Sequence, residues 1–338
     1  SGCIRQMGNA RPNSMNIFSR LLKSISIRMA YGYFKIRSWW FVWFSVINRK
    51  NRRAWRAYKL ELSAVQKRIV ADLQKDGIAV AHCDELFPGK NLCAEFQDYV
   101  RAHTAGADTR TYKIFLRNLW DAVPRIDLKN PFVPLALADE ILGTVNGYMR
   151  MCAYFFYLTL NVTTPVPEGA EAVQSQRWHG DPEDKKMCKV FLYLTDVDDT
   201  AGPFIYVRGT QWGGRWRHLF REHQPRGFIL AHNRPIEELV PASDIRRFTG
   251  KAGTIIFCDT SGYHRGGYAT AHERIMLTMG YCSSANAYPI RVRFEEGFAD
   301  EVAQKNFSHA AQFALGFAPG RMTSWMFRII KPHFKYGA

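Results

Sequence analysis

Residues 189–207 read KVFLYLTDVDDTAGPFIYV, in which two apolar runs flank a polar stretch that ends at Gly202 and Pro203. Short runs rich in β-branched and aromatic residues, bounded by turn-forming residues, are typical of β-strands. The runs 189–197 and 204–207 are therefore predicted strands. Three more runs of this kind occupy residues 151–162, 254–258 and 275–281.

The first half of the chain has a helical pattern instead. Residues 58–75 carry apolar side chains three and four positions apart, which indicates a helix, and Gly77 is suited to end it. Two further helices and one short strand are predicted at residues 92–103, 134–145 and 78–81. Helices followed by strands predict an α+β fold whose strand-rich part is a jelly roll or barrel.

The formal net charge of +16 is concentrated near the start of the chain. Residues 1–70 hold 15 lysines and arginines and a single acid, Glu61, which leaves a charge of only +2 for the remainder. Such a charge block bears on binding partners rather than on the fold. We divide the chain into a basic, aromatic-rich extension (1–57), a near-neutral globular domain (58–290) and a helical, basic tail (291–338).

Within the extension, five aromatic side chains precede a cluster of five bases. They are Trp39, Trp40, Phe41, Trp43 and Phe44, followed by Arg49, Lys50, Arg52, Arg53 and Arg56. This combination suits a helix that lies on an anionic membrane surface. It also suits a helix that packs its aromatics on its own domain, and, ranked lower, stacking on single-stranded nucleic acid. The three alternatives stay open on the sequence.

The seven cysteines are scattered and form no CxxC pair, which favours a reducing, cytoplasmic compartment over a secreted one. No apolar run approaches the roughly 20 residues that a membrane-spanning helix needs. We expect a cytoplasmic protein, attached to the cytoplasmic face of a membrane if the extension binds lipid.

The segment QSQRWHGDPED, residues 174–184, contains the candidate metal ligands His179 and Asp181. In an extended chain, residues i and i+2 project from the same face, so this imidazole and carboxylate can point at one site. Pro182 then ends regular strand pairing. His264 lies 85 residues after His179, behind a predicted strand, and is the candidate second imidazole.

Two imidazoles and one carboxylate form the facial triad of non-haem Fe(II) oxygenases, which leaves positions for a 2-oxoacid and dioxygen. Arg274 offers a guanidinium for the remote carboxylate of that 2-oxoacid. Thr278 lies on the same face of the same predicted strand and can add a hydroxyl donor. The triad residues are therefore candidate catalytic groups and metal ligands, and Arg274 and Thr278 are candidate cofactor contacts.

Four other side chains are candidates for contacts around this site. Tyr157 is a candidate cofactor contact, and Gln176 and Trp178 are candidates to line the substrate pocket. Arg265, next to His264, is placed to reach an anionic substrate. Each of the four has an ordinary alternative role in the core or on the surface.

Residues 73–284 resemble the phytanoyl-CoA dioxygenase superfamily of Fe(II)/2-oxoglutarate-dependent oxygenases. The resembling segments are DLQKDGIAV, DELFPG, QRWHGD, VFLYLTDVDDTAGPFIYVRGTQ, GTIIFCDTSGYHRGG and ERIMLTMGY. The resemblance implies a double-stranded β-helix (jelly-roll, cupin-like) core with flanking helices. It also implies iron held by His179, Asp181 and His264, with 2-oxoglutarate anchored by Arg274.

The activity that the resemblance implies is the O2-dependent decarboxylation of 2-oxoglutarate, coupled to hydroxylation of an unactivated C–H bond of a small or lipid-linked substrate. Asp181 favours hydroxylation, because halogenating relatives lack this carboxylate. Residues 208–211 read RGTQ where the family often has PGSH, and Gly266 replaces a frequent hydroxyl residue. The alternatives are a nucleic-acid- or ribosome-associated hydroxylase and a non-catalytic binding protein with the same fold.

Overall fold

The computed structural model describes residues 17–58, 60–104, 111–113, 115–121, 123–167, 169–222, 228–230, 234–316 and 320–333. Its strands are β1 (Ile78–His82), β2 (Thr111–Lys113), β3 (Leu116–Asn118), β4 (Arg125–Ile126), β5 (Tyr154–Thr163), β6 (Cys188–Tyr193), β7 (Phe204–Val207), β8 (Phe220–Glu222), β9 (Phe228–Leu230), β10 (Ile245–Phe248), β11 (Thr254–Cys258), β12 (His264–Gly266), β13 (Arg274–Cys282) and β14 (Arg293–Phe294). Five of them, β5, β6, β7, β11 and β13, correspond to the five strands predicted after residue 150.

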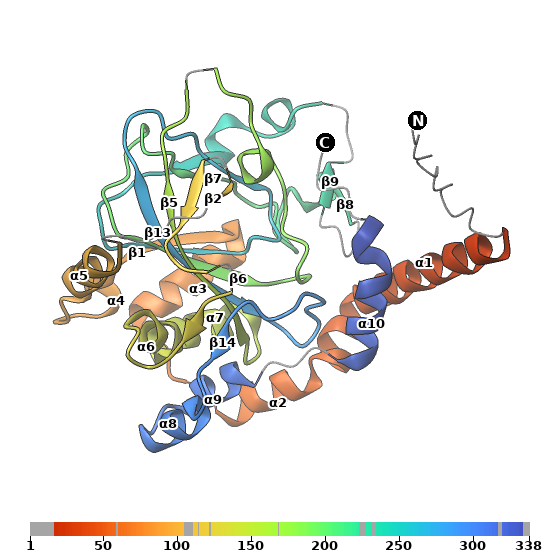
Figure 1. The fold of residues 1–338 in the computed structure, drawn as a ribbon, viewed down its shortest axis with the longest axis horizontal. Helices are drawn as coiled ribbons and strands as arrows, with labels where there is room; N and C mark the ends of the chain where they lie inside the picture. Colours follow the sequence, from red (N-terminus) through yellow and green to blue (C-terminus); the bar gives the residue numbers. More distant parts are fainter. Residues whose placement is uncertain are drawn as a thin grey trace, which may run out of the picture.

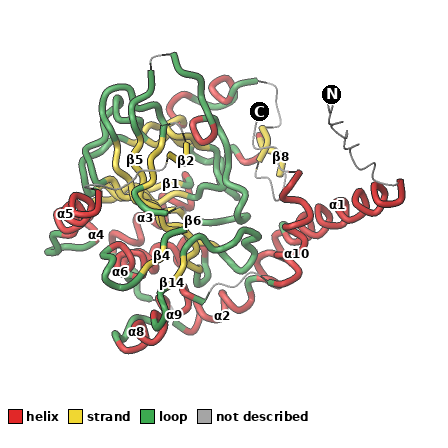
Figure 2. Tube along the Cα trace, in the orientation of Figure 1, coloured by secondary structure: helices red, strands yellow, loops and turns green. Residues whose placement is uncertain are grey.

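The strands form two antiparallel sheets at the centre of the molecule (Figure 2). The larger sheet has the strand order β1-β11-β6-β13-β5-β3-β2, and the smaller has the order β10-β7-β12. Two short ladders, β14-β4 and β8-β9, lie outside these sheets in the described part of the chain.

Helices surround the sheets and extend beyond them (Figure 1). They are α1 (Ile17–Arg37), a π-helix (Val42–Ile47), α2 (Arg49–Ala57), α3 (Ala64–Asp76), α4 (Cys83–Leu86), α5 (Leu92–Thr104), α6 (Phe132–Leu137), α7 (Asp139–Met149), α8 (Phe298–Gln304), α9 (His309–Leu315) and α10 (Arg321–Ile330). Short 3₁₀ turns lie at Gln174–Gln176, Arg217–Leu219, Ile236–Glu238, Ala242–Asp244 and Lys331–His333.

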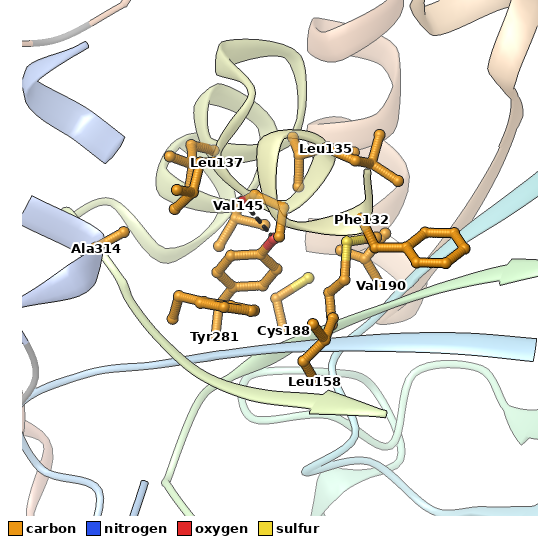
Figure 3. Close-up of a cluster of buried hydrophobic side chains, with 14 of the residues drawn as sticks. Phe132, Leu135, Leu137, Val145, Leu158, Cys188, Val190, Tyr281 and Ala314 are labelled. Atoms are coloured by element: carbon orange, nitrogen blue, oxygen red, sulfur yellow. Dashed lines mark hydrogen bonds between the residues drawn. The ribbon is translucent and has the colours of Figure 1, made fainter. Parts of the chain in front are cut away.

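One face of the larger sheet is covered by helices. Because side chains alternate along a strand, every second residue of β5, β6 and β13 points to this face. These residues join Ile69 of α3 and Val145 of α7 in the main core. Figure 3 shows part of this core, where the Tyr281 hydroxyl donates to the Ala136 carbonyl at 2.7 Å. Each fully buried aliphatic side chain contributes about 1.5–3 kcal/mol to folding.

The other face of the larger sheet looks toward the smaller sheet. Phe191 and Tyr193 of β6 pack here with Phe204 and Tyr206 of β7 in a second buried cluster. Two antiparallel sheets that enclose a shared interior constitute a jelly roll. The predicted α+β fold with a jelly-roll core and flanking helices is thus confirmed, and the interior between the sheets is where a site can form.

One predicted helix ends where the sequence indicated, and another is interrupted. Gly77 ends α3 in the left-handed conformation, with φ +79°, and donates to the Leu73 carbonyl at 2.9 Å, as the sequence predicted. The single helix predicted at 134–145 is wrong, because α6 and α7 are separated by Ala138, whose backbone is extended. Asp139 and Glu140 then favour a new helix start through their charge at its N-terminus.

Residues 17–58 and α10 form a segment that we call the arm. Figure 1 shows α1 and α10 side by side, running away from the sheets. None of the described helices has both the length and the apolar composition required to cross a bilayer. Residues 1–16 and 334–338 of the predicted extension and tail lie outside the described residues.

The middle of the arm packs into the globular domain. Trp43 is buried in the main core, and its Nε1–H donates to Asp184 Oδ1 at 2.7 Å. The side chains of Asn48 and Asn51 are also buried and donate to Ser283 Oγ and the Cys152 carbonyl at 3.0 and 2.7 Å. Intramolecular packing, one of the three alternatives for the extension, therefore describes this part of it.

We predict that Trp43→Phe lowers the free energy of unfolding by about 1–3 kcal/mol, because it removes the indole donor from the buried Asp184 Oδ1 and leaves the Lys185 N–H as its remaining donor among the described residues. Trp39→Phe is the matched control, since Trp39 is exposed and its replacement should change stability by no more than about 0.5 kcal/mol. Denaturant unfolding of both variants measures the difference. Equal losses would contradict the structural role of Trp43.

Candidate metal centre

A short backbone ladder brings the three predicted metal ligands together. The His179 N–H donates to the His264 carbonyl at 2.9 Å, and the His264 N–H donates back to the His179 carbonyl at 2.8 Å. The Asp181 N–H then donates to the Thr260 carbonyl at 2.7 Å. Residues 179–181 therefore run alongside the segment that enters β12, at the smaller sheet.

The side chains of His179, Asp181 and His264 converge on one point. Their ligand atoms all lie within 4.8 Å of one another. His179 Nε2 is 3.8 Å from Asp181 Oδ1, and His264 Nε2 is 3.8 Å from Asp181 Oδ2. Two imidazole nitrogens and a carboxylate in this arrangement match the donor set of a facial triad for a divalent metal.

Backbone carbonyls fix the tautomer of both imidazoles. His179 Nδ1 lies 2.8 Å from the Arg177 carbonyl, and His264 Nδ1 lies 2.9 Å from the Gly262 carbonyl. A carbonyl can only accept, so each Nδ1 carries the hydrogen and each neutral ring keeps its Nε2 lone pair for a metal. Burial, with a smaller effect from the nearby His179, lowers the pKa of His264 to about 3.

Tyr206 packs against the segment that carries His264. Its ring lies 6.5 Å from the imidazole of His264, nearly parallel to it, and its hydroxyl donates to the Asp259 carbonyl at 3.0 Å. A Cβ added to Gly262 would lie 1.9 Å from this hydroxyl oxygen. Only glycine allows this approach, so Gly262 and Tyr206 together set the position of His264.

Lys189 is a member of the site that the sequence analysis missed. Its Nζ lies 2.6 Å from Asp181 Oδ2 and 3.5 Å from Glu183 Oε1, and all three side chains are largely buried. Burial acts to raise the pKa of Asp181, but the Lys189 ammonium, which also donates to this carboxylate, outweighs it and lowers that pKa. The signal available in the sequence was a lysine near the start of an otherwise apolar strand.

Arg274 and Thr278 lie on the face of the larger sheet that looks toward the smaller sheet, which we call the inner face. Polar side chains of β5 lie on the same face. In the β13–β5 register, Arg274 pairs with Thr163 and Thr278 pairs with Thr159. The buried guanidinium of Arg274 donates from Nη2 to Thr163 Oγ1 at 3.0 Å and from Nη1 to the Gly202 carbonyl. Tyr157 occupies the same face of β5, opposite Gly280.

Two buried polar atoms on this inner face have no hydrogen-bond partner among the described residues. They are Arg274 Nε and Asn161 Oδ1. Buried polar groups usually have partners, and an unsatisfied one costs about 1–3 kcal/mol. A bound carboxylate would accept from the Arg274 Nε–H, so the inner face fits an anionic ligand such as the remote end of a 2-oxoacid.

The three predicted pocket residues lie at different places around the ladder. Gln176 is buried, and its Oε1 accepts from the Val173 N–H at 3.2 Å. Trp178 stacks on Tyr263 with 5.4 Å between ring centroids, and the Arg265 guanidinium lies 4.8 Å from the Trp178 ring centroid. Trp178 thus joins a cluster outside the interior between the sheets, and a substrate contact of these residues stays a prediction.

Neither a protein-family model nor a curated protein matches this chain. Among solved structures, it is similar to the epimerase SnoN, crystallised with Fe3+, alpha-ketoglutarate and nogalamycin RO, at 18% identity and a TM-score of 0.49 over 67% of this chain and 86% of SnoN. It is also similar to EctD from S. alaskensis with bound Fe, at 16% identity and a TM-score of 0.45 over 76% and 88% of the two chains.

A third similar structure is HygX from Streptomyces hygroscopicus with nickel, 2-oxoglutarate and hygromycin B, at 16% identity and a TM-score of 0.42 over 66% and 88% of the two chains. Likenesses this distant do not show which activity this chain has.

We predict that replacing His179, Asp181 or His264 by alanine weakens Co2+ binding by more than about 100-fold, since loss of a supporting hydrogen bond alone costs 10–100-fold. His272→Ala is the matched control, because His272 forms an exposed pair with Asp198, with 3.3 Å between Nδ1 and Oδ2. Titration calorimetry of the metal-free protein measures all four variants. A parent that does not bind Co2+, or equal weakening in His272→Ala, would contradict the assignment.

A second prediction concerns the Lys189–Asp181 pair. In metal-free protein at neutral pH, Lys189→Met should lose about 3–5 kcal/mol of unfolding free energy, because it leaves two buried acids without their cation. Lys251→Met, which breaks the exposed pair with Asp196, should lose no more than about 1 kcal/mol. Denaturant unfolding compares the two.

The loss of unfolding free energy in Lys189→Met should also depend on pH. The lowered pKa of Asp181 contributes stability that is present above the unfolded value, near 3.9, and is lost as the pH falls further. The stability difference between parent and Lys189→Met should therefore narrow below about pH 4. A difference that stays constant with pH would show that the charge pair is not its cause.

Proposed function

We propose that this chain is an Fe(II)- and 2-oxoglutarate-dependent oxygenase that hydroxylates a C–H bond of an organic substrate. The observation that carries the proposal is the convergence of His179, Asp181 and His264 within 4.8 Å, on the jelly-roll interior that also holds the buried Arg274. Membership of the phytanoyl-CoA dioxygenase superfamily stays a prediction from the sequence resemblance.

The three ligands supply what a ferrous ion requires. His179 and His264 would each offer an Nε2 lone pair, and Asp181 would supply one negative charge, which leaves further positions for a chelating 2-oxoacid and dioxygen. When bound, iron allows 2-oxoglutarate and dioxygen to react, so that succinate and carbon dioxide form and one oxygen atom enters the substrate as a hydroxyl group. Because Asp181 is present, hydroxylation is favoured over halogenation.

The inner faces of the two sheets provide the remaining functions. Arg274 would bind the remote carboxylate of 2-oxoglutarate through its unpaired Nε–H, and Thr278 lies on the same face to add a hydroxyl. Phe191, Tyr193 and Phe204 line this interior with buried apolar surface. Apolar walls exclude water, which strengthens the charge contacts and protects reactive species from side reactions.

The direct test of the proposal is turnover of the co-substrate. With Fe(II) and dioxygen, the parent protein should convert 2-oxoglutarate to succinate, even if slowly without its primary substrate. The conversion should disappear in His179→Ala and persist in His272→Ala. The proposal would be contradicted if the parent formed no more succinate than His179→Ala does.

The role of Arg274 gives a separate prediction. Arg274→Lys should weaken 2-oxoglutarate binding to the Co2+-loaded protein by about 10- to 100-fold, because one ammonium group cannot keep the contacts to Thr163 and Gly202 and also present an N–H where the Arg274 Nε–H lies. Arg247→Lys on β10 is the control, since this arginine is exposed. Anaerobic titration calorimetry measures both, and unchanged binding in Arg274→Lys would place the co-substrate elsewhere.

A further inference from the structure

Exposed apolar side chains gather on the arm rather than being spread over the molecule. Of the thirteen large apolar side chains that are exposed among the residues of described burial, twelve belong to the arm. They are Leu21, Leu22, Ile25, Met29, Ile36, Trp39, Trp40, Phe41, Val46, Tyr58, Met322 and Trp325. Scattered exposed apolar residues are normal, but a concentration of this kind marks a surface that binds something.

Helix α1 has two apolar faces, and only one of them is packed. Ala30 and Phe34 are buried against Phe327 of α10 and its neighbours. Leu22, Ile25, Met29 and Ile36 follow one another at steps of three, four and seven residues, which places them on one face of the helix, and each is about half exposed. A helix that only packed on its own domain would carry polar residues there.

The charge of the arm is entirely positive. Residues 21–58 contain nine lysines and arginines and no acid, and α10 and the turn after it add Arg321, Arg328 and Lys331. Within the described part of the chain, none of these bases forms an ion pair with a carboxylate. Their charge is therefore available to an external anionic surface.

A cavity beside α2 combines both features of the arm. It has a volume of about 660 Å³ and is lined by Arg49, Lys50 and Arg53 together with apolar Val46 and Phe313. A phosphate or carboxylate headgroup would find cations here, and the first carbons of its chain would find apolar contact.

We propose that the arm docks this protein on the surface of an anionic lipid bilayer. The exposed apolar stripe of α1 and the exposed tryptophans would enter the interfacial region, while the bases contact headgroups. A nucleic acid would use the bases but would leave the aliphatic stripe of Leu22, Ile25 and Met29 in water. A second copy of the arm would bring its positive charge against the first, which opposes self-association.

The test uses the full-length protein and needs neither iron nor 2-oxoglutarate. Binding to vesicles of phosphatidylcholine alone is compared with binding to vesicles that also contain phosphatidylserine, at low and high salt, by co-sedimentation. The parent should bind the anionic vesicles selectively, and high salt should weaken binding. Tryptophan emission should shift to the blue on binding, because Trp39, Trp40 and Trp325 leave water.

Two matched variants connect binding to the arm. Leu22→Glu/Met29→Glu should lower the apparent affinity for anionic vesicles by at least about tenfold, since it places charge in the apolar stripe. Val80→Glu changes an exposed apolar residue of β1, away from the arm, and should bind like the parent. Circular dichroism and Co2+ binding check that both variants fold.

Four results would overturn the proposal. The first is a parent that does not bind anionic vesicles at low salt, and the second is equal vesicle binding by the two variants. The third is displacement of the vesicles from the protein by a single-stranded oligonucleotide at equal phosphate concentration. The fourth is a dimer of the parent that Leu22→Glu/Met29→Glu abolishes and Val80→Glu does not.

Discussion

The metal centre depends on two chain segments, 85 residues apart, that are joined through their backbones. His179 and His264 exchange both of their N–H···O=C hydrogen bonds, and Asp181 adds a third bond to the Thr260 carbonyl. This pairing fixes which side chains face the interior and which face outward. A slip of one residue would turn the ligands away from one another, so the ladder carries the geometry on which the proposed chemistry rests.

The larger sheet serves the site by having two different faces. Along β6, Val190 and Leu192 lie under the helices, while Lys189, Phe191 and Tyr193 face the interior between the sheets. The helix-covered face supplies the stabilising apolar burial. The opposite face can then hold costly buried polar groups, and the unpaired Nε of Arg274 is of the kind that a ligand would satisfy.

Local patterns in the sequence were sufficient for the candidate ligands and for six of the fourteen described strands, β1, β5, β6, β7, β11 and β13, but not for the eight short strands that remain. The HxD spacing and the strand before His264 indicated which residues could meet, because alternation along a strand is a local property. The contacts of Lys189 and Trp43 were not predictable in this way. Asp184 is 141 residues from Trp43, and the bond between them depends on how the arm packs on the finished domain. The break at Ala138 was missed because helical spacing continues across it.

The proposed chemistry requires that His179, Asp181 and His264 hold ferrous iron on one side and leave room for a 2-oxoacid. Anaerobic addition of Fe(II) and 2-oxoglutarate to the purified protein tests it most directly. We expect a weak charge-transfer band in the visible spectrum of the parent that is absent from His179→Ala. A parent that shows no band, or a His179→Ala variant that shows the same band, would rule out this iron site.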